Sequence, residues 1–309
     1  MLRREDIKGV IAFMPTVFTP SGVLDEESNR ENVRTLISRG IPIVQATGGA
    51  AEFYALTVNE HEAMMRAVAE EAAGRARTIC GCGTVMGTSD AIERVRIAME
   101  CGIDAAMLTT PPYFAATPSE VIRFFEEIAS AVPGIGLTHY NTGRAKVVLR
   151  GEDYRELATI PSFLGVKHGT ANLYEWFSSY SLSPELAHFV TDELWVPAMM
   201  VGATAVDSIL AATRPVFAIN LWQLCEHRKW EEAMAFQCKA WRFARATNAL
   251  PEAEALYGDC SIDKGVVNAA GVLRVGGPRA PYSPVDDRFL ELWRHRFREF
   301  DEGKYDGDW

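Results

Sequence analysis

The chain has 309 residues, of which 48% are hydrophobic and 23% are charged, and its formal net charge is -10. This composition is typical of a folded globular protein and excludes an intrinsically disordered chain. The negative charge argues against a nucleic-acid partner, because phosphate backbones would be repelled. The longest apolar stretch, residues 196–206, is about half as long as a membrane-spanning helix, so we expect no membrane partner.

The six cysteines are sparse and none forms a C-x-x-C pair, which predicts reduced thiols rather than a disulfide framework. The first residues turn acidic where a signal peptide would turn apolar, so we expect a cytoplasmic protein. The six histidines form neither an H-x-H nor an H-E-x-x-H motif. A metal-dependent hydrolase or aldolase is therefore disfavoured, and no metal site is predicted.

Short β-rich segments alternate with helical patterns through the first two thirds of the chain. Eight candidate strands begin near Gly9, Pro42, Thr78, Ala105, Ile135, Phe163, Ala187 and Ala205. Strands that alternate with helices indicate βαβ crossovers and a parallel sheet, and eight such units fit a closed barrel. The sequence therefore predicts an α/β protein with a (β/α)8 TIM barrel.

Two of the intervening helices have recognisable ends. The pair Thr57 and Glu60 forms a capping-box pattern that begins one helix, and Gly74 ends it. A second helix begins at Thr117 and Pro118, with proline at its first position.

A doubly wound sheet is the alternative architecture. That fold commonly carries a glycine-rich turn for a dinucleotide or phosphate, and the sequence has neither G-x-G-x-x-G nor G-x-x-x-x-G-K. After residue 226 the strand pattern stops, and helices are predicted over residues 230–247, 262–273 and 286–300. We expect a catalytic barrel in residues 1–226 and a helical extension, residues 227–309, packed on it.

Catalytic groups of such barrels lie where strands end, so the residues that close each apolar run are informative. The sixth run ends in Lys167. Burial of a lysine lowers its pKa and exposes a neutral amine that can attack a carbonyl. The alternative is a lysine that simply emerges into solvent. The fifth run ends in Tyr140, which is either a proton relay or an ordinary capping aromatic residue.

Two further loops could bind substrate. The second run ends in Gly48, Gly49 and Ala50, whose backbone N–H groups could converge on a carboxylate, although a tight turn gives the same pattern. The fourth run ends in Pro111-Pro112-Tyr113, where the prolines stiffen a loop that presents an aromatic hydroxyl. Its alternative is a rigid surface turn.

Together, these four loops resemble the N-acetylneuraminate lyase and dihydrodipicolinate synthase superfamily of Schiff-base (class I) aldolase barrels. The resemblance implies that Lys167 forms a Schiff base with pyruvate or another 2-oxo acid and that Tyr140 moves protons. It also implies a substrate carboxylate bound by residues 48–50, no metal and no organic cofactor. Members of this family are homo-oligomers, so we expect a dimer or homotetramer in which Tyr113 crosses the interface.

Three positions depart from the family pattern. The loop Gly48-Gly49-Ala50 lacks the hydroxyl that relatives place there, and Thr47 lies two positions too early to replace it. Arg144 comes one residue earlier than in the synthases; it either clamps a substrate carboxylate or is a surface arginine. Asp207, at the end of the eighth strand, takes a commonly apolar position and would contact the iminium or a substrate hydroxyl unless it is solvated.

Two expectations concern the neighbours of these residues. His139 and His168 should point away from their catalytic neighbours, because successive side chains of a strand alternate between its faces. Trp195, with Phe53 and Tyr54, would offer an aromatic surface to a larger or more apolar aldehyde.

The sequence thus predicts a Schiff-base-forming lyase that carries out reversible aldol cleavage or condensation. Its substrates would be small molecules, namely pyruvate or a related 2-oxo acid and an aldehyde. One alternative is a 2-keto-3-deoxy sugar-acid dehydratase that uses the same lysine, and another is dihydrodipicolinate synthase proper. A barrel that binds 2-oxo acids without turnover is the remaining possibility, and the presence of both Lys167 and Tyr140 argues against it.

Overall fold

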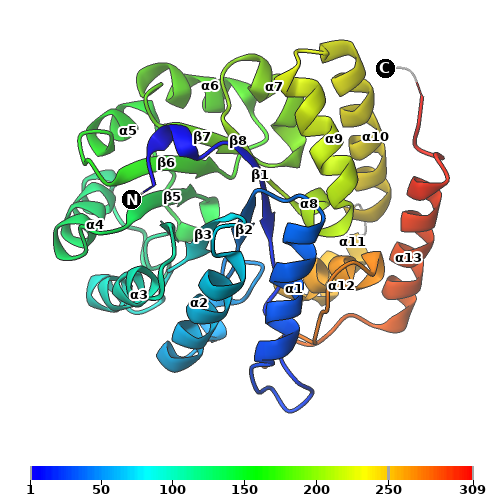
Figure 1. The fold of residues 1–309 in the computed structure, drawn as a ribbon, viewed down its shortest axis with the longest axis horizontal. Helices are drawn as coiled ribbons and strands as arrows, with labels where there is room; N and C mark the ends of the chain where they lie inside the picture. Colours follow the sequence, from blue (N-terminus) through cyan, green and yellow to red (C-terminus); the bar gives the residue numbers. More distant parts are fainter. Residues whose placement is uncertain (1, 249–250, 308–309) are drawn as a thin grey trace.

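The computed structural model describes residues 2–248 and 251–307. Eight parallel strands pair in chain order, and the last returns to pair with the first, which closes a barrel (Figure 1). The strands are β1 (Gly9–Phe13), β2 (Ile43–Gln45), β3 (Arg77–Gly81), β4 (Ala105–Leu108), β5 (Gly136–Asn141), β6 (Phe163–His168), β7 (Ala187–Val190) and β8 (Ala205–Ser208). The predicted (β/α)8 barrel is confirmed, and each strand lies where its apolar run indicated.

Helices surround the barrel and connect its strands. They are α1 (Glu26–Ser38), α2 (Val58–Ala72), α3 (Thr88–Cys101), α4 (Pro118–Ala131), α5 (Gly151–Leu157), α6 (Leu173–Leu182), α7 (Trp195–Met200) and α8 (Ile209–Thr213). The predicted capping boxes form at Thr57 with Glu60 and at Thr117 with Glu120. Each box satisfies N–H groups of the first helical turn, which have no partner within the helix.

The inside of the barrel holds its own apolar cluster, separate from the core between the strands and the helices. The inner cluster includes Ile11, Ile43, Ile79, Met107 and Phe189, one from each of five strands. Leu2 and Ile7, from the N-terminal segment, belong to the same cluster and fill the end of the barrel at which the strands begin. The polar side chains inside the barrel therefore lie at its opposite end, where the strands finish.

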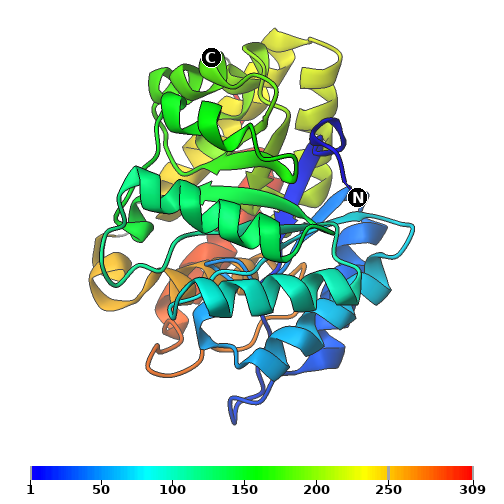
Figure 2. The ribbon, with the colours of Figure 1, turned by 90° about the vertical axis from the view of Figure 1, so that its left-hand side faces the viewer.

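The remaining helices are α9 (Pro215–Glu226), α10 (Trp230–Asn248), α11 (Pro251–Leu256), α12 (Asp259–Ala270) and α13 (Asp287–Asp301). The helices α9, α10 and α13 lie side by side on one flank of the barrel (Figure 1). Seen from the flank that carries α3 to α5, this group lies behind the strands (Figure 2). Helices appear in all three predicted C-terminal segments, and α12 begins three residues earlier than expected. The domain boundary at residue 226 stays a prediction.

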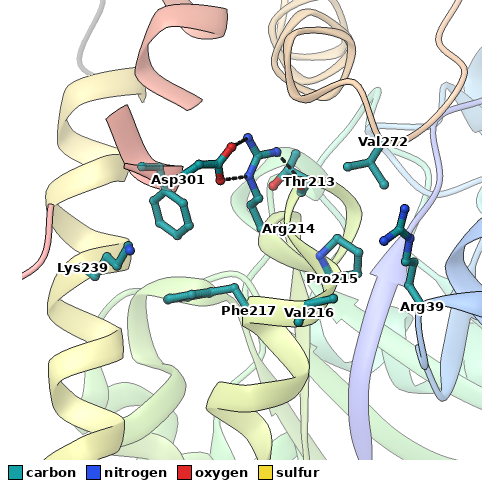
Figure 3. Close-up of a pocket in the computed structure, with 10 residues that line it drawn as sticks. Arg39, Thr213, Arg214, Pro215, Val216, Phe217, Lys239, Val272 and Asp301 are labelled. Carbon is teal, nitrogen blue, oxygen red and sulfur yellow. Dashed lines mark hydrogen bonds and ion pairs between the residues drawn. The ribbon is translucent and has the colours of Figure 1, made fainter. Parts of the chain in front are cut away.

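An arginine between α8 and α9 connects the last helix to the barrel. Arg214 donates to both carboxylate oxygens of Asp301 at 2.7 and 2.8 Å, and its guanidinium lies 4.4 Å from the ring centre of Phe297. Figure 3 shows this pair beside a cavity of about 360 Å³ that Arg39 and Lys239 also line. The bidentate geometry fixes the end of α13 against the barrel.

Two negative expectations can be compared with the part of the chain that the structure describes. None of its helices is long and apolar enough to cross a membrane. All six cysteines are free.

A β-bulge in β6 decides which of its side chains enter the barrel. The pairing of β6 with β5 shifts by one residue, because Leu137 pairs with Phe163 and the next residue pairs with Gly165. Phe163 and Val166 both pack in the outer core, whereas Leu164 belongs to the inner cluster. A regular strand would place residues 163 and 166 on opposite faces. The bulge restores the inward direction at Lys167.

We predict that Gly165→Ala destabilises the fold by about 1–3 kcal/mol, the usual cost of overpacking. A Cβ atom at Gly165 would lie 2.3 Å from the carbonyl oxygen of Ala187 and 2.8 Å from its Cβ, so β6 and β7 would have to separate. Urea unfolding measures the change. Gly143→Ala is the matched control, since a Cβ there meets nothing within 4 Å. Equal stabilities for the two variants would contradict the proposed close packing at the bulge.

Candidate active site

Four polar side chains converge inside the barrel where the strands end. Lys167 of β6 donates from Nζ to Oδ2 of Asp207 on β8, at 2.8 Å. The same oxygen accepts a hydrogen bond from Nε2 of Gln45 on β2, at 2.9 Å. The ring of Tyr140 on β5 covers the amine, with Nζ 4.5 Å from the ring centre. The barrel therefore brings together groups that are far apart in the sequence.

The ion pair of Lys167 with Asp207 is buried, with 12% and 3% of the two side chains exposed. Burial by itself disfavours the ammonium and is the largest single effect, but the charge and hydrogen bond of Asp207, together with Tyr140 and Asp263, outweigh it, and the pKa of Lys167 is raised above its ordinary value. Burial does lower this pKa, as the sequence suggested, but the net shift is upward, because the sequence argument left out the neighbouring acids. In the resting protein Lys167 is an ammonium ion.

The hydroxyl of Tyr140 has an unexpected partner. Arg144, which follows β5, donates from Nη1 to the phenol oxygen at 3.3 Å. The same guanidinium donates from Nε to Asp259 of α12 at 2.9 Å. Arg144 is thus an exposed arginine, 65% accessible, that is paired with Asp259 and connects the phenol to the C-terminal extension.

The loop after β2 offers backbone N–H groups, as the sequence suggested. The N–H groups of Ala51, Glu52 and Phe53 are bonded within the loop, whereas no described residue accepts from those of Gly48, Gly49 and Ala50. A Cβ on Gly48 would lie 3.1 Å from Oε1 of Gln45, so the loop borders the polar cluster. Three free donors next to Gln45 have the chemistry to receive a carboxylate.

Thr47 does not supply the missing loop hydroxyl. Its Oγ1 donates to the carbonyl of Gly81 at 2.7 Å, and its backbone is left-handed, with φ of 53°. Gly81 must lack a side chain here, because a Cβ would lie 2.1 Å from the carbonyl oxygen of Thr47. Thr47 thus fixes the loop to β3.

A buried ion pair ties the same loop to the C-terminal extension. Glu52 bonds to Lys264 of α12, and 0% and 2% of these two side chains are exposed. Oε2 of Glu52 also accepts the backbone N–H of Arg279 at 2.8 Å. Removing one partner of a buried pair typically costs about 3–5 kcal/mol. The extension therefore helps to hold the candidate carboxylate loop in place.

The helix α12 contributes two acids that sequence reasoning missed. Asp259 binds Arg144, and Asp263 lies one turn further on the same face of the helix. Burial, reinforced by Asp259, raises the pKa of Asp263 to about 6 against the opposing effect of Arg144 and Lys167. The four-residue spacing was the available signal, but nothing in the sequence placed α12 beside β5.

Tyr113 lies apart from this cluster within a single chain. Its side chain is 78% exposed and packs edge-on against Phe114, which is 80% exposed. Lys146 donates to the backbone carbonyl of Tyr113 at 2.8 Å, which fixes the loop but not the phenol.

The two neighbouring histidines point out of the barrel, as expected from strand alternation. Nδ1 of His139 lies 2.9 Å from the hydroxyl of Tyr154, and Nε2 of His168 lies 2.9 Å from Nδ1 of His188. Burial lowers the pKa of His139 to about 3 and that of His188 to about 4.

The expected aromatic surface is wrong in one member. Trp195, the first residue of α7, is fully buried in the core between the strands and the helices. It therefore cannot contact a substrate inside the barrel. Phe53 and Tyr54 remain half-buried, with ring centres 5.5 Å apart.

Metal chemistry has no visible centre in the described ranges, 2–248 and 251–307. No group of three or more histidine, cysteine, aspartate or glutamate side chains there is arranged to hold a metal ion. The polar cluster itself offers an amine, a phenol, an amide and a carboxylate.

The chain matches known proteins over most of its length. The family model of the dihydrodipicolinate synthetase family matches residues 6–292. A 4-hydroxy-tetrahydrodipicolinate synthase of Corynebacterium aurimucosum is 26% identical over 285 residues, which is 91% of each chain. A "Probable 5-dehydro-4-deoxyglucarate dehydratase 1" of Streptomyces coelicolor is 35% identical over 166 residues, 53% of this chain and 51% of the other.

Similarity extends to solved structures. The dihydrodipicolinate synthase of Acinetobacter baumannii, in complex with pyruvate, is 26% identical, with a TM-score of 0.85 over 96% of this chain and 99% of that one. Three observations point to the same family: the closed barrel, the lysine in its interior and the match over residues 6–292. The chain belongs to the dihydrodipicolinate synthetase family of lyases.

Proposed function

We propose that the protein is a Schiff-base-forming lyase of the aldolase type that acts on pyruvate or a related 2-oxo acid. The observation that carries this proposal is the amine of Lys167, held inside the barrel between the carboxylate of Asp207 and the ring of Tyr140. An amine in such a place adds to a ketone, and loss of water gives an iminium. The iminium draws electrons from the neighbouring C–C bond, so that bond can break or form.

The other predicted residues have roles that fit their positions. The free N–H groups of Gly48, Gly49 and Ala50 would bind the carboxylate of the 2-oxo acid. Tyr140 would move protons between the substrate oxygen and the amine. Arg144 would bind a second substrate oxygen or carboxylate after releasing Asp259. Asp207 would face the C2 centre of the bound substrate.

Two acids beside the lysine bear on the second substrate. Asp207 contacts Nζ directly, and Asp263 lies within electrostatic reach of it. A second substrate with its own carboxylate would be repelled by them, and Arg144 is already paired with an acid. We therefore favour an uncharged aldehyde over the substrate of a dihydrodipicolinate synthase. Half-buried Phe53 and Tyr54 supply apolar surface near the loop.

Dehydration of a sugar acid is the second candidate function. Its support is the 35% identity to the Streptomyces coelicolor protein named as a dehydratase. The same iminium can expel a hydroxyl from the carbon next but one to it, with an acid as proton donor. Incubation with 2-keto-3-deoxy sugar acids separates the two activities, since an aldolase releases pyruvate and a dehydratase releases water from an intact carbon chain.

The assembly is also part of the proposal. The exposed pair Tyr113 and Phe114 is an apolar surface of the kind that subunit interfaces cover, which supports a homodimer or homotetramer. The free cysteines support a reducing compartment such as the cytoplasm.

Lys167 should be the covalent nucleophile. Borohydride reduction with pyruvate is expected to add the mass of one reduced pyruvate to the peptide that contains Lys167, and Lys167→Ala should abolish the adduct. Lys146→Ala, which removes an exposed lysine, is the control and should retain it. Burial lowers the pKa of Lys264, so peptide mapping must separate the two sites. An adduct that persists in Lys167→Ala would show that Lys167 is not the nucleophile.

Removing the hydroxyl of Tyr140 should slow turnover without unfolding the protein. Acid–base groups contribute about 100- to 10,000-fold, so Tyr140→Phe is expected to lose activity in that range while it keeps the ring over Lys167. Steady-state kinetics and circular dichroism measure the two effects. Tyr174→Phe alters a tyrosine that is 81% exposed and should behave like wild type. Full activity of Tyr140→Phe at neutral pH would reject the role.

If Tyr113 acts across a subunit interface, two inactive variants should complement each other. A mixed oligomer of Lys167→Ala and Tyr113→Ala chains contains sites with an intact lysine from one chain and an intact tyrosine from the other. We expect partial recovery of activity after co-refolding, and sedimentation that reports a dimer or tetramer. A fully active monomer at micromolar concentration would remove any need for a neighbour's tyrosine.

A further inference from the structure

The two carboxylate oxygens of Asp207 differ in their hydrogen bonds. Its Oδ2 accepts from both Lys167 Nζ, at 2.8 Å, and Gln45 Nε2, at 2.9 Å. Its Oδ1 receives no hydrogen bond from any described residue. Because Gln45 donates to the oxygen that faces the amine, the carboxylate is oriented toward Lys167 even when the lysine moves. The oxygen Oδ1 is left for a group that comes with the substrate.

We propose that Asp207 is the acid–base partner of Lys167: it takes a proton from the ammonium before attack and gives that proton to the hydroxyl that leaves as water. This inference rests on the proposed Schiff-base function. It makes Asp207 a catalytic residue rather than only a contact of the iminium or of a substrate hydroxyl.

The step balances as follows. The ammonium of Lys167 carries three hydrogens. The first passes to Asp207, and the free amine forms the N–C bond to C2 while the carbonyl electron pair moves to oxygen. The second passes from nitrogen to that oxygen, with Tyr140 as carrier. Protonated Asp207 then donates to the resulting hydroxyl, which departs as water while the nitrogen lone pair forms the C=N bond. The third hydrogen stays on the iminium, whose charge the regenerated carboxylate neutralises.

Other titratable groups are less well placed for this task. Before substrate binds, Nζ lies above the ring centre of Tyr140 of β5, so the phenol is not placed to take the first proton; its hydroxyl serves only the later transfer to the substrate oxygen. Asp263 of α12 acts on Lys167 through its charge, without a hydrogen bond to it. Asp192, which follows β7, accepts from the hydroxyl of Ser208 on one oxygen and from the N–H of Ile209 on the other. Asp207 is the acid in direct contact with the nucleophile.

The first test uses unmodified protein and the pH dependence of adduct formation. The pKa of Lys167 lies above the ordinary value of about 10.4. If the amine were freed only by bulk water, the rate of borohydride-trapped iminium formation with pyruvate would fall about tenfold per pH unit below that value. Transfer to Asp207 within the site predicts a nearly constant rate from pH 6 to pH 8. A tenfold slope through this range would overturn the inference.

The second test removes the carboxylate with Asp207→Asn, which keeps the size of the side chain. Competitive acetylation of the protein without substrate, read by mass spectrometry, should report a lower pKa for Lys167, because the main opposition to burial is then removed. Iminium formation at pH 7 should slow by about 100- to 10,000-fold. Asp192→Asn removes a nearby acid that does not contact Lys167 and should leave its acetylation profile unchanged.

The outcomes separate this inference from the proposed function. Absence of any adduct in the wild-type protein with a panel of 2-oxo acids would reject the Schiff-base function itself. A wild-type adduct with an unchanged rate in Asp207→Asn would reject only the acid–base role, even if the pKa of Lys167 shifts. If Asp207→Asn fails to fold, as circular dichroism would reveal, the pH profile of the unmodified protein still decides.

Discussion

The chemistry of this barrel depends on one buried ion pair, between Lys167 and Asp207. Burying two charges is costly, and only close geometry and further hydrogen bonds offset the loss of hydration. The bond at 2.8 Å supplies the geometry, and Gln45 supplies a second donor to the carboxylate. In the proposed mechanism, this pair keeps Lys167 as an ammonium ion next to the carboxylate that takes its proton. The amine would then be freed by proton transfer along the hydrogen bond rather than by exchange with solvent.

The rest of the fold serves to bring that pair together. The two residues come from β6 and β8, which are separated by β7, so they meet only because the closed barrel turns their side chains toward a common interior. The bulge at Gly165 corrects the direction of Lys167. The C-terminal extension then surrounds the site from outside, through Lys264 on Glu52 and Asp259 on Arg144.

Much of this could be predicted from the sequence, because strand ends and barrel order are local patterns. Lys167 and Tyr140 are candidates because their apolar runs stop there, and the family resemblance implies their roles. The sequence also placed Asp207 near the future iminium, but it left a solvated Asp207 open, because the contact of residue 167 with residue 207 depends on which face each strand turns inward, and a one-residue bulge reverses that choice. Asp263 was not predicted as a site residue for a related reason. Sequence spacing indicates which residues share a helix face, but it does not indicate the element against which that face packs. Trp195 was misplaced by the same uncertainty.

The most direct test of the account is a crystal structure of the protein reduced with borohydride in the presence of pyruvate. The account predicts continuous electron density from Nζ of Lys167 to C2 of the former pyruvate, with its carboxylate on the N–H groups of residues 48–50 and Asp207 beside the new bond. Pyruvate bound without a covalent link, or attached to any other lysine, would contradict it.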